Sequence, residues 1–162
     1  MRLRSEAHQV FMAARRIPPL LLFASLLLAA CGRPAAPDHL RPDEELKAAL
    51  GLTDADRVHR VLLEGGAVER AIPERVEISP TDYVSFESGD GRVHEVRFLL
   101  DSLPAKARTF LVRSRQDASP PLLSRGSRFV VMWDGAPAGR YPFIVEGNSG
   151  SARGLVIVRS VP

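Results

Sequence analysis

Cysteine is nearly absent from this 162-residue chain, which holds a single one, Cys31. One thiol cannot form a disulfide within the chain, so the chain is not a disulfide-stabilised secreted domain. Long hydrophobic runs are also scarce. The run from Ile17 to Ala30 has 14 residues, and as a helix it would cover about 21 Å, less than the roughly 30 Å of a hydrocarbon core. This length argues against a transmembrane helix.

The first thirty residues have the three parts of a secretory signal. Arg15 and Arg16 precede the apolar run, and the run ends in the small residues Ala29 and Ala30 directly before Cys31. A basic region, a short apolar region and a small-residue cleavage site are typical of a signal peptide. The sequence therefore predicts a signal peptide over residues 1–30, with an uncleaved membrane anchor as the alternative. Met12 also opens a complete signal by itself, which leaves the true start open between Met1 and Met12.

The residues "LAAC" at 28–31 resemble the lipobox of bacterial lipoproteins. The resemblance implies that the chain is cut before Cys31 and that this residue carries the lipid. Cys31 would then be neither a nucleophile nor a copper ligand. Because Gly32 follows it and not aspartate, the resemblance implies the outer membrane, facing the periplasm. The membrane is thus one predicted partner, reached through the lipid, and an unknown envelope protein is the other.

The remainder of the chain has no excess of charge of either sign. Residues 1–30 hold four of the 22 basic residues and one of the 19 acidic residues, so residues 31–162 carry 18 of each. The basic character of the whole sequence therefore belongs to the signal. A neutral domain has no electrostatic basis for binding nucleic acid, and we expect no such partner.

Composition changes along the chain predict four regions. After the signal, residues 31–42 contain three prolines and read as a tether behind the lipidated cysteine. Residues 43–56 form a short helix and a linker, with acids at the helix start and Gly51 after its end. A second helix is expected over residues 104–116. Residues 57–162 otherwise show strand patterns.

Seven strand-like segments separated by turn residues predict an all-β domain. They lie at 57–65, 72–78, 83–88, 92–100, 127–133, 140–146 and 154–158, and they are rich in valine, leucine and isoleucine. Short strands at close spacing are typical of an antiparallel β-sandwich, here with one or two short helices. The large residues expected to fill its core are Phe86, Phe98, Phe129, Trp133 and Phe143. An exposed binding role for Trp133 is the alternative.

The segment from about residue 57 to 160 resembles the cupredoxins, the family of plastocyanin and azurin. "ISPTDYVSFES" is similar to the turn before one of the family's strands, and "GDGRVHEVRF" to the segment with the first copper-binding histidine. "GAPAGRYPFIVEGNSGSARGLVIV" is similar to the family's last hairpin. The resemblance implies a Greek-key β-sandwich.

The same resemblance implies that most of the copper site is lost. A blue copper site needs a thiolate and two imidazoles, with a weak axial thioether. The first histidine position is kept as His94, but Val145 stands at the cysteine position, Asn148 at the second histidine and Ala152 or Arg153 at the methionine. We therefore expect no metal and no cofactor. The alternative is a copper-binding or electron-transfer protein with an altered site that uses His94, alone or with His59.

Enzymatic patterns are also missing. The sequence has no G-x-S-x-G, and its glycine-rich "GNSGSARG" lacks the lysine of a phosphate-binding loop. We expect the protein not to be an enzyme, but a cell-envelope lipoprotein whose cupredoxin-like domain acts as a binding or interaction module. The loop predicted at 146–153, with Glu146, Asn148 and Arg153, is the expected interaction surface, because loops on a rigid sandwich commonly carry recognition.

Overall fold

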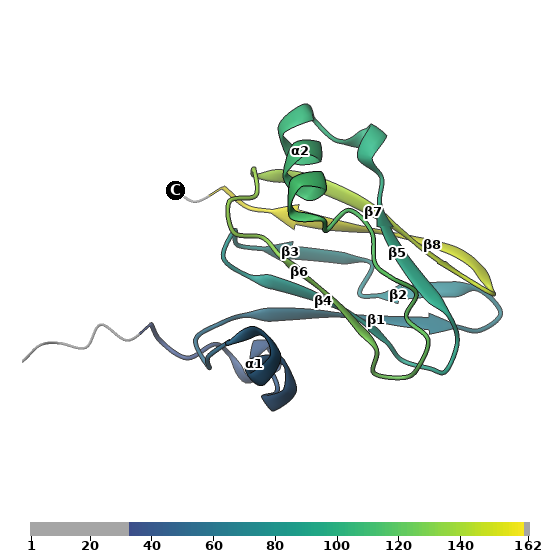
Figure 1. Cartoon of the computed structure of the whole chain (residues 1–162), viewed down its shortest axis with the longest axis horizontal. Coiled ribbons are helices and arrows are strands. Elements are labelled where there is room, and N and C mark those ends of the chain that lie inside the picture. Colours follow the sequence, from purple (N-terminus) through teal and green to yellow (C-terminus); the bar gives the residue numbers. More distant parts are fainter. Residues whose placement is uncertain (1–32, 161–162) are drawn as a thin grey trace, which may run out of the picture. The chain divides into compact units, whose positions relative to one another are not determined.

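The computed structural model describes residues 33–160, which form two four-stranded β-sheets and two short α-helices (Figure 1). The predicted signal peptide and the lipid site, Cys31, lie outside the described residues. Within residues 33–160 no helix has the length and apolar character needed to cross a membrane.

The strands follow one another with few insertions. They are β1 (Val58–Gly65), β2 (Glu69–Ile72), β3 (Arg75–Ile78), β4 (Tyr83–Ser88), β5 (His94–Phe98), β6 (Arg128–Met132), β7 (Gly139–Gly147) and β8 (Gly150–Val158). The helices are α1 (Glu44–Leu50) and α2 (Ala105–Ser114), with short 3₁₀ turns at Asp38–Leu40 and Leu100–Ser102. The predicted all-β sandwich with two short helices is confirmed.

One sheet has the strand order β2-β1-β4-β6 and the other β3-β8-β7-β5. Most neighbours are antiparallel, as predicted, but each sheet also contains one parallel pair, β1 with β4 and β3 with β8. The sequence pattern did not reveal these pairs, because side chains alternate with the same period in both arrangements. The parallel pairing of β1 and β4 places the first residues of both strands at the same end of the sandwich.

The segment predicted as a strand over residues 72–78 forms the shorter strand β3, and a separate strand that the sequence did not predict, β2, precedes it in the other sheet. β2 ends at Ile72, a cis peptide bond joins Ile72 to Pro73, and β3 begins at Arg75. Proline cannot donate a hydrogen bond to a sheet ladder, so the chain leaves the first sheet here and enters the second. This change of sheet positions Glu69, on β2, beside strands of the second sheet.

The core lies between the two sheets and is rich in aromatic rings. Phe86, Phe98, Trp133 and Phe143 are fully buried, as predicted, and Phe129 is partly buried against them. The ring centroids of Phe86 and Phe143 are 4.9 Å apart at 75°, an edge-to-face arrangement that aromatic pairs favour. The exposed binding role considered for Trp133 is therefore wrong.

Helix α1 has the ends that the sequence predicted, whereas α2 ends at Ser114, two residues before the predicted end at 116. Asp43 Oδ1 accepts a hydrogen bond from Leu46 N at 2.9 Å and caps α1, which closes at Gly51 in the left-handed conformation (φ 67°). After α2, residues 117–122 run beside β5, with Leu122 N donating to His94 O at 2.8 Å. This strap covers the open edge of β5, which an additional strand would otherwise be free to pair with.

The predicted tether, 31–42, packs against the domain over its described part, residues 33–42. Ala36 is 2 % exposed and its N–H donates to Asp54 O at 2.7 Å. Arg41 Nε donates to Ala36 O, and Arg60 Nη2 donates to Arg41 O, each at 2.9 Å. The prolines prevent a regular helix, as expected, but they do not prevent an extended chain from bonding to the domain surface.

Candidate functional site

His94 is the only predicted copper ligand that the chain retains, and it begins β5 with its side chain inside the sandwich. It is 0 % exposed and pairs across the sheet with Gly147 of β7. Alternation along β5 puts His94, Val96 and Phe98 on the inner face, since all three are buried while Glu95 and Arg97 are exposed. A fully buried imidazole must find hydrogen-bond partners inside the protein.

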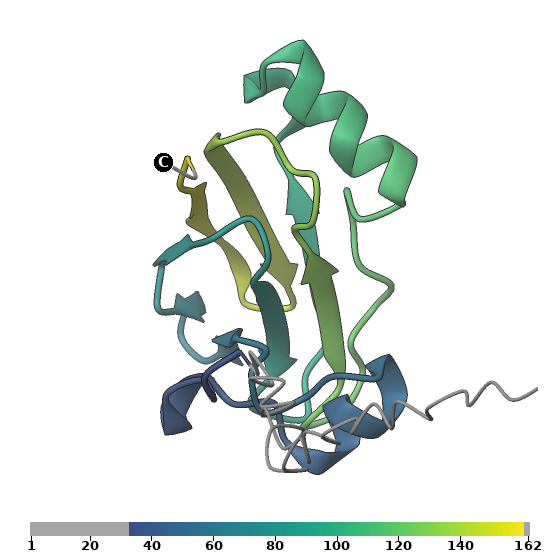
Figure 2. The same ribbon diagram turned by 90° about the vertical axis from the view of Figure 1, so that its left-hand side faces the viewer.

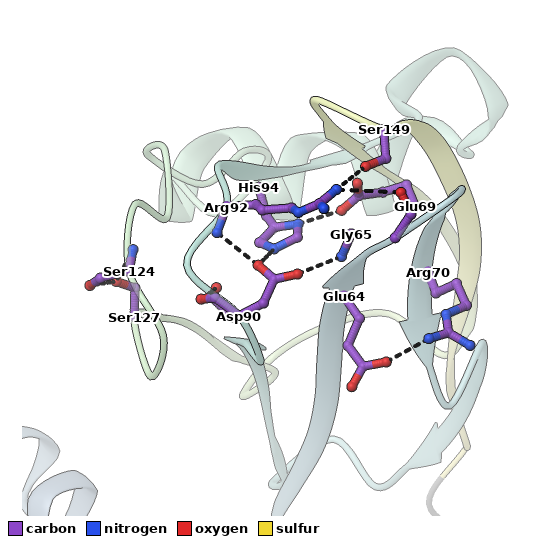
Figure 3. Close-up of polar contacts among 12 residues, drawn as sticks. Glu64, Gly65, Glu69, Arg70, Asp90, Arg92, His94, Ser124, Ser127 and Ser149 are labelled. Atoms are coloured by element: carbon purple, nitrogen blue, oxygen red, sulfur yellow. Dashed lines mark hydrogen bonds and ion pairs between the residues drawn. The ribbon is translucent and has the colours of Figure 1, made fainter.

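Two carboxylates engage the His94 ring, one at each nitrogen (Figure 3). Nδ1 lies in hydrogen-bonding contact with Glu69 Oε1 from β2, and Nε2 is 2.9 Å from Asp90 Oδ1 in the β4–β5 turn. The Glu69 side chain is 1 % exposed and that of Asp90 23 % exposed. We call these three residues the Glu69–His94–Asp90 cluster.

The cluster holds more protons than a neutral imidazole supplies. A neutral ring has one N–H and one bare nitrogen, and a bare nitrogen against a carboxylate oxygen would place two acceptors together. Both contacts of His94 therefore need a hydrogen, so the cluster carries a second proton, on the ring or on one of the carboxyl groups. Hydrogen bonds of this charge-assisted kind are shorter and stronger than neutral ones.

Backbone donors fix the Asp90 carboxylate. Its Oδ1 accepts from Arg92 N and its Oδ2 from Gly65 N, each at 2.8 Å. Burial alone would raise the pKa of Asp90, but the hydrogen bonds from Arg92 N, His94 and Gly65 N outweigh it and lower the pKa to about 2. Asp90 thereby ties the last residue of β1 to the first residue of β5.

Asp90→Asn should remove stability in a pH-dependent way. Because folding depresses the pKa of Asp90 from 3.8 to about 2, its ionised form stabilises the protein above pH 4, by about 1–2 kcal/mol after solvent screening, and this is lost as the pH falls towards 2. In urea unfolding, the gap between wild type and Asp90→Asn should shrink from pH 5 to pH 2. A gap that stays constant over this range would contradict the assignment. Asp101→Asn, at an exposed position, is the matched control.

Glycines make room for the Glu69 carboxylate. A Cβ added to Gly147 would lie 2.5 Å from Glu69 Oε2 and 2.9 Å from the backbone oxygen of Val93, distances that no side chain tolerates. Above the cluster, Arg92 Nη1 donates to Ser149 Oγ at 2.8 Å and to Gly66 O at 3.3 Å. Glu69 Oε2 is buried and has no hydrogen-bond partner among the described residues.

Sequence reasoning missed Glu69, although it is the residue that encloses His94. In β2, Glu69 and Ala71 are buried while Arg70 and Ile72 are exposed. The alternation of a four-residue strand is too short to be convincing, and a charged residue is rarely expected on its inner face. The signal that could have found Glu69 is its chemical match to His94, a histidine that shares its strand face with Val96 and Phe98.

The three predicted lost-ligand positions lie in a hairpin that leaves no room for a metal-binding loop. β7 and β8 stay paired to the end, with Val145 opposite Ala152 and Gly147 opposite Gly150, so that only Asn148 and Ser149 form the turn. Val145 is 0 % exposed and shares its inner face with Tyr141 and Phe143, as predicted.

The prediction that residues 146–153 form a loop is wrong. Glu146 belongs to β7 and Arg153 to β8, and both point to the outer face of their sheet, while Asn148 is exposed in the turn. Glu146 Oε1 accepts from Arg97 Nη2 at 2.8 Å on the same face. Glycine and serine at 147–151 suggested a flexible loop, but glycine equally suits a tight turn, and Gly150 adopts φ 109° there.

His59 and His94 lie at opposite ends of the sandwich, so they cannot share a metal ion. His59 Nε2 is 3.0 Å from Asp82 Oδ2 near the start of β1, whereas the His94 cluster bonds to Gly65 at its end. Six residues of strand separate His59 from Gly65, about 20 Å.

The residues present do not fit a blue copper centre. No thiolate is available at Val145, and both His94 nitrogens are turned to carboxylates that sit on opposite sides of the ring. Within residues 33–160 no group of three or more histidine, cysteine, aspartate or glutamate side chains is arranged to hold a metal ion.

No protein-family model matches the chain, and no curated protein matches its sequence. Among solved structures, the chain is similar to a novel purple cupredoxin from Nitrosopumilus maritimus, with a TM-score of 0.41 and 17 % identity over 62 % of this chain and 99 % of that one. It is also similar to amicyanin from Paracoccus versutus, with a TM-score of 0.43 and 18 % identity over 63 % of this chain and 81 % of that one. A copper-containing nitrite reductase from Thermus scotoductus SA-01 gives a TM-score of 0.49 and 18 % identity over 70 % of this chain, but only 25 % of that one.

The fold of the described residues is a β-sandwich. Two sheets of four strands, with only two short helices, form the sandwich that the sequence predicted. The similar structures come from copper proteins, but at these identities a likeness extends to the fold alone, and a fold hosts many functions. Function must therefore be argued from the cluster and from the chain's own residues.

Proposed function

We propose that this protein is a lipid-anchored protein of the bacterial cell envelope whose cupredoxin-like domain works without copper, as a binding or interaction module. One observation supports the absence of copper in this proposal. Both nitrogens of His94 are engaged by carboxylates of the protein itself, Glu69 and Asp90, so a metal ion would have to break one of two charge-assisted hydrogen bonds before it met a single imidazole.

The short turn of the β7–β8 hairpin also supports a domain that works without copper. In a trigonal copper site several ligands must converge from one loop, and here that loop is replaced by the two-residue turn at Asn148 and Ser149. The inner position of Val145 is filled by apolar packing against the aromatic core. A domain with its site closed in this way can still serve as a rigid scaffold that presents surface residues to a partner.

The lipid anchor rests on the sequence around Cys31. A signal of the right form ends in "LAAC", and the only thiol of the chain stands where the lipid would be attached. Outer-membrane placement, facing the periplasm, follows from Gly32 at the next position. A non-enzymatic role follows from the missing catalytic patterns and stays a prediction.

Site-specific photo-crosslinking in living cells tests the interaction role. A photo-crosslinking residue at Asn148, exposed in the β7–β8 turn, is compared with the same residue at the exposed Glu74, between β2 and β3. We expect a discrete protein adduct at Asn148, equal in yield in copper-depleted and copper-replete cells, and none at Glu74. No adduct at Asn148, or one that forms only in copper-replete cells, would favour the copper-handling alternative.

A further inference from the structure

The connection between the predicted lipid and the folded domain is short. Among the described residues, Ala36 is the first whose backbone N–H and carbonyl are both hydrogen-bonded. The N–H donates to Asp54 O and the carbonyl accepts from Arg41 Nε. Arg33, three residues earlier, already donates from Nη2 to Thr81 Oγ1 at 3.1 Å. Five Cα–Cα steps separate Cys31 from Ala36, so the covalent chain spans at most about 19 Å between them.

This connection starts from one end of the sandwich. Asp54 and Arg57 precede β1, and Thr81 precedes β4, and these two strands are parallel. We call this the Thr81 end. The Glu69–His94–Asp90 cluster lies at the other end, because Asp90 bonds to Gly65, the last residue of β1. We call this the His94 end.

Strand β1 is longer than the greatest distance that the chain from Cys31 to Ala36 can span. β1 has eight residues, which extend over about 23 Å. A lipid on Cys31, inserted in a bilayer, therefore does not allow the domain to stand on its His94 end, with the Thr81 end away from the membrane. Arg33 and Arg57 are both exposed at the Thr81 end, and guanidinium groups suit the phosphates of lipid headgroups.

We propose that the Thr81 end rests against the bilayer and that the His94 end points away from it, into the compartment. This inference rests on the proposed lipidation of Cys31. It gives the domain a fixed orientation, in which the β7–β8 turn with Asn148 is the part presented to a partner. Residues 33–42 then orient the domain, whereas a loose tether would only retain it.

Fluorescence quenching on vesicles tests the orientation. Once Cys31 is lipidated the protein has no other thiol, so a cysteine introduced as Thr81→Cys or as Asn148→Cys takes a fluorophore at that place alone. Both positions are exposed turns. The full lipidated protein is placed in vesicles of phosphatidylethanolamine and phosphatidylglycerol that contain a lipid with a headgroup quencher.

We expect the label at Thr81 to be quenched at least about threefold more than the label at Asn148. Inserting twelve glycine and serine residues between Gly32 and Arg33 should reduce this difference, since the flexible linker would span roughly 20 Å more. Equal quenching at both positions in the lipidated protein without the insertion would overturn the orientation alone. A protein whose mass shows no lipid on Cys31 would overturn the lipid anchor, and the orientation with it.

Discussion

His94→Ala should lower the free energy of unfolding by about 3–5 kcal/mol at pH 7, the range expected when one partner of a buried ion pair is removed. The substitution leaves the Glu69 carboxylate, 1 % exposed, without its imidazole, and it frees Asp90 from the start of β5. Urea unfolding followed by tryptophan fluorescence measures the loss, because Trp133 is the only tryptophan and is fully buried.

Three further variants distinguish a loss that is specific to the cluster from the general effect of losing a histidine. His59→Ala removes an imidazole that bonds to one carboxylate, Asp82, and is 17 % exposed, so it should cost only about 1 kcal/mol. The double variant Glu69→Leu/His94→Leu removes the buried Glu69 carboxylate together with the imidazole and leaves only the partly exposed Asp90, which backbone N–H groups still hold. It should therefore be more stable than His94→Leu alone. If His94→Ala and His59→Ala cost the same, the cluster is not the strong contact described above.

Gly147→Ala should also destabilise the protein strongly, by about 2–3 kcal/mol, through overpacking. The new methyl group would lie 2.5 Å from Glu69 Oε2 and 2.9 Å from the Val93 backbone oxygen, and it would push the carboxylate away from His94. Differential scanning calorimetry measures the loss as a lower melting temperature.

The Gly147 effect should depend on Glu69. In a Glu69→Ala background the carboxylate is gone, so adding the methyl group at 147 should cost clearly less than it does in the wild type, a coupling that a double-mutant cycle measures. Gly91→Ala is the matched control, because a Cβ there meets nothing within 4 Å, and it should change stability by less than about 0.5 kcal/mol. An equal cost for Gly147→Ala in both backgrounds would show that the backbone contact alone sets it.

Local patterns were enough to predict the fold. Alternating residues gave most of the strands, Asp43 and Gly51 gave the limits of α1, and the aromatic residues gave the core. These features depend on neighbours in the sequence, which is why one sequence reveals them. The inward position of Val145 follows from the same alternation along β7.

The pairing of distant segments could not be predicted. Glu69 and His94 are 25 residues apart, and the two meet only because the chain changes sheet at Pro73 and because Gly147 leaves space. The docking of Ala36 on Asp54, and the tight turn at Asn148, likewise depend on contacts that composition does not encode. A Pro-rich or Gly-rich segment suggests flexibility, but its tertiary hydrogen bonds decide its conformation.

The structure shows what surrounds the histidine that the resemblance to the cupredoxins singled out. The resemblance of the sequence to the cupredoxins implied that most copper ligands are missing. It identified no partner for the remaining histidine, His94. In the protein, that histidine lies between two acids, Glu69 and Asp90, which bond to its two ring nitrogens. These contacts connect β2 and the β4–β5 turn to the start of β5, and they give the buried imidazole its partners.

The most direct test of a copper-free domain is a copper titration of residues 32–162, prepared without lipid and followed by visible absorption and electron paramagnetic resonance. We expect no blue absorption band and no Cu(II) binding tighter than about 10 μM, which corresponds to about −7 kcal/mol, in a protein that stays folded throughout. A one-to-one Cu(II) signal of higher affinity, abolished by His94→Ala, would contradict this expectation and would show that copper displaces Glu69 or Asp90 from the His94 ring.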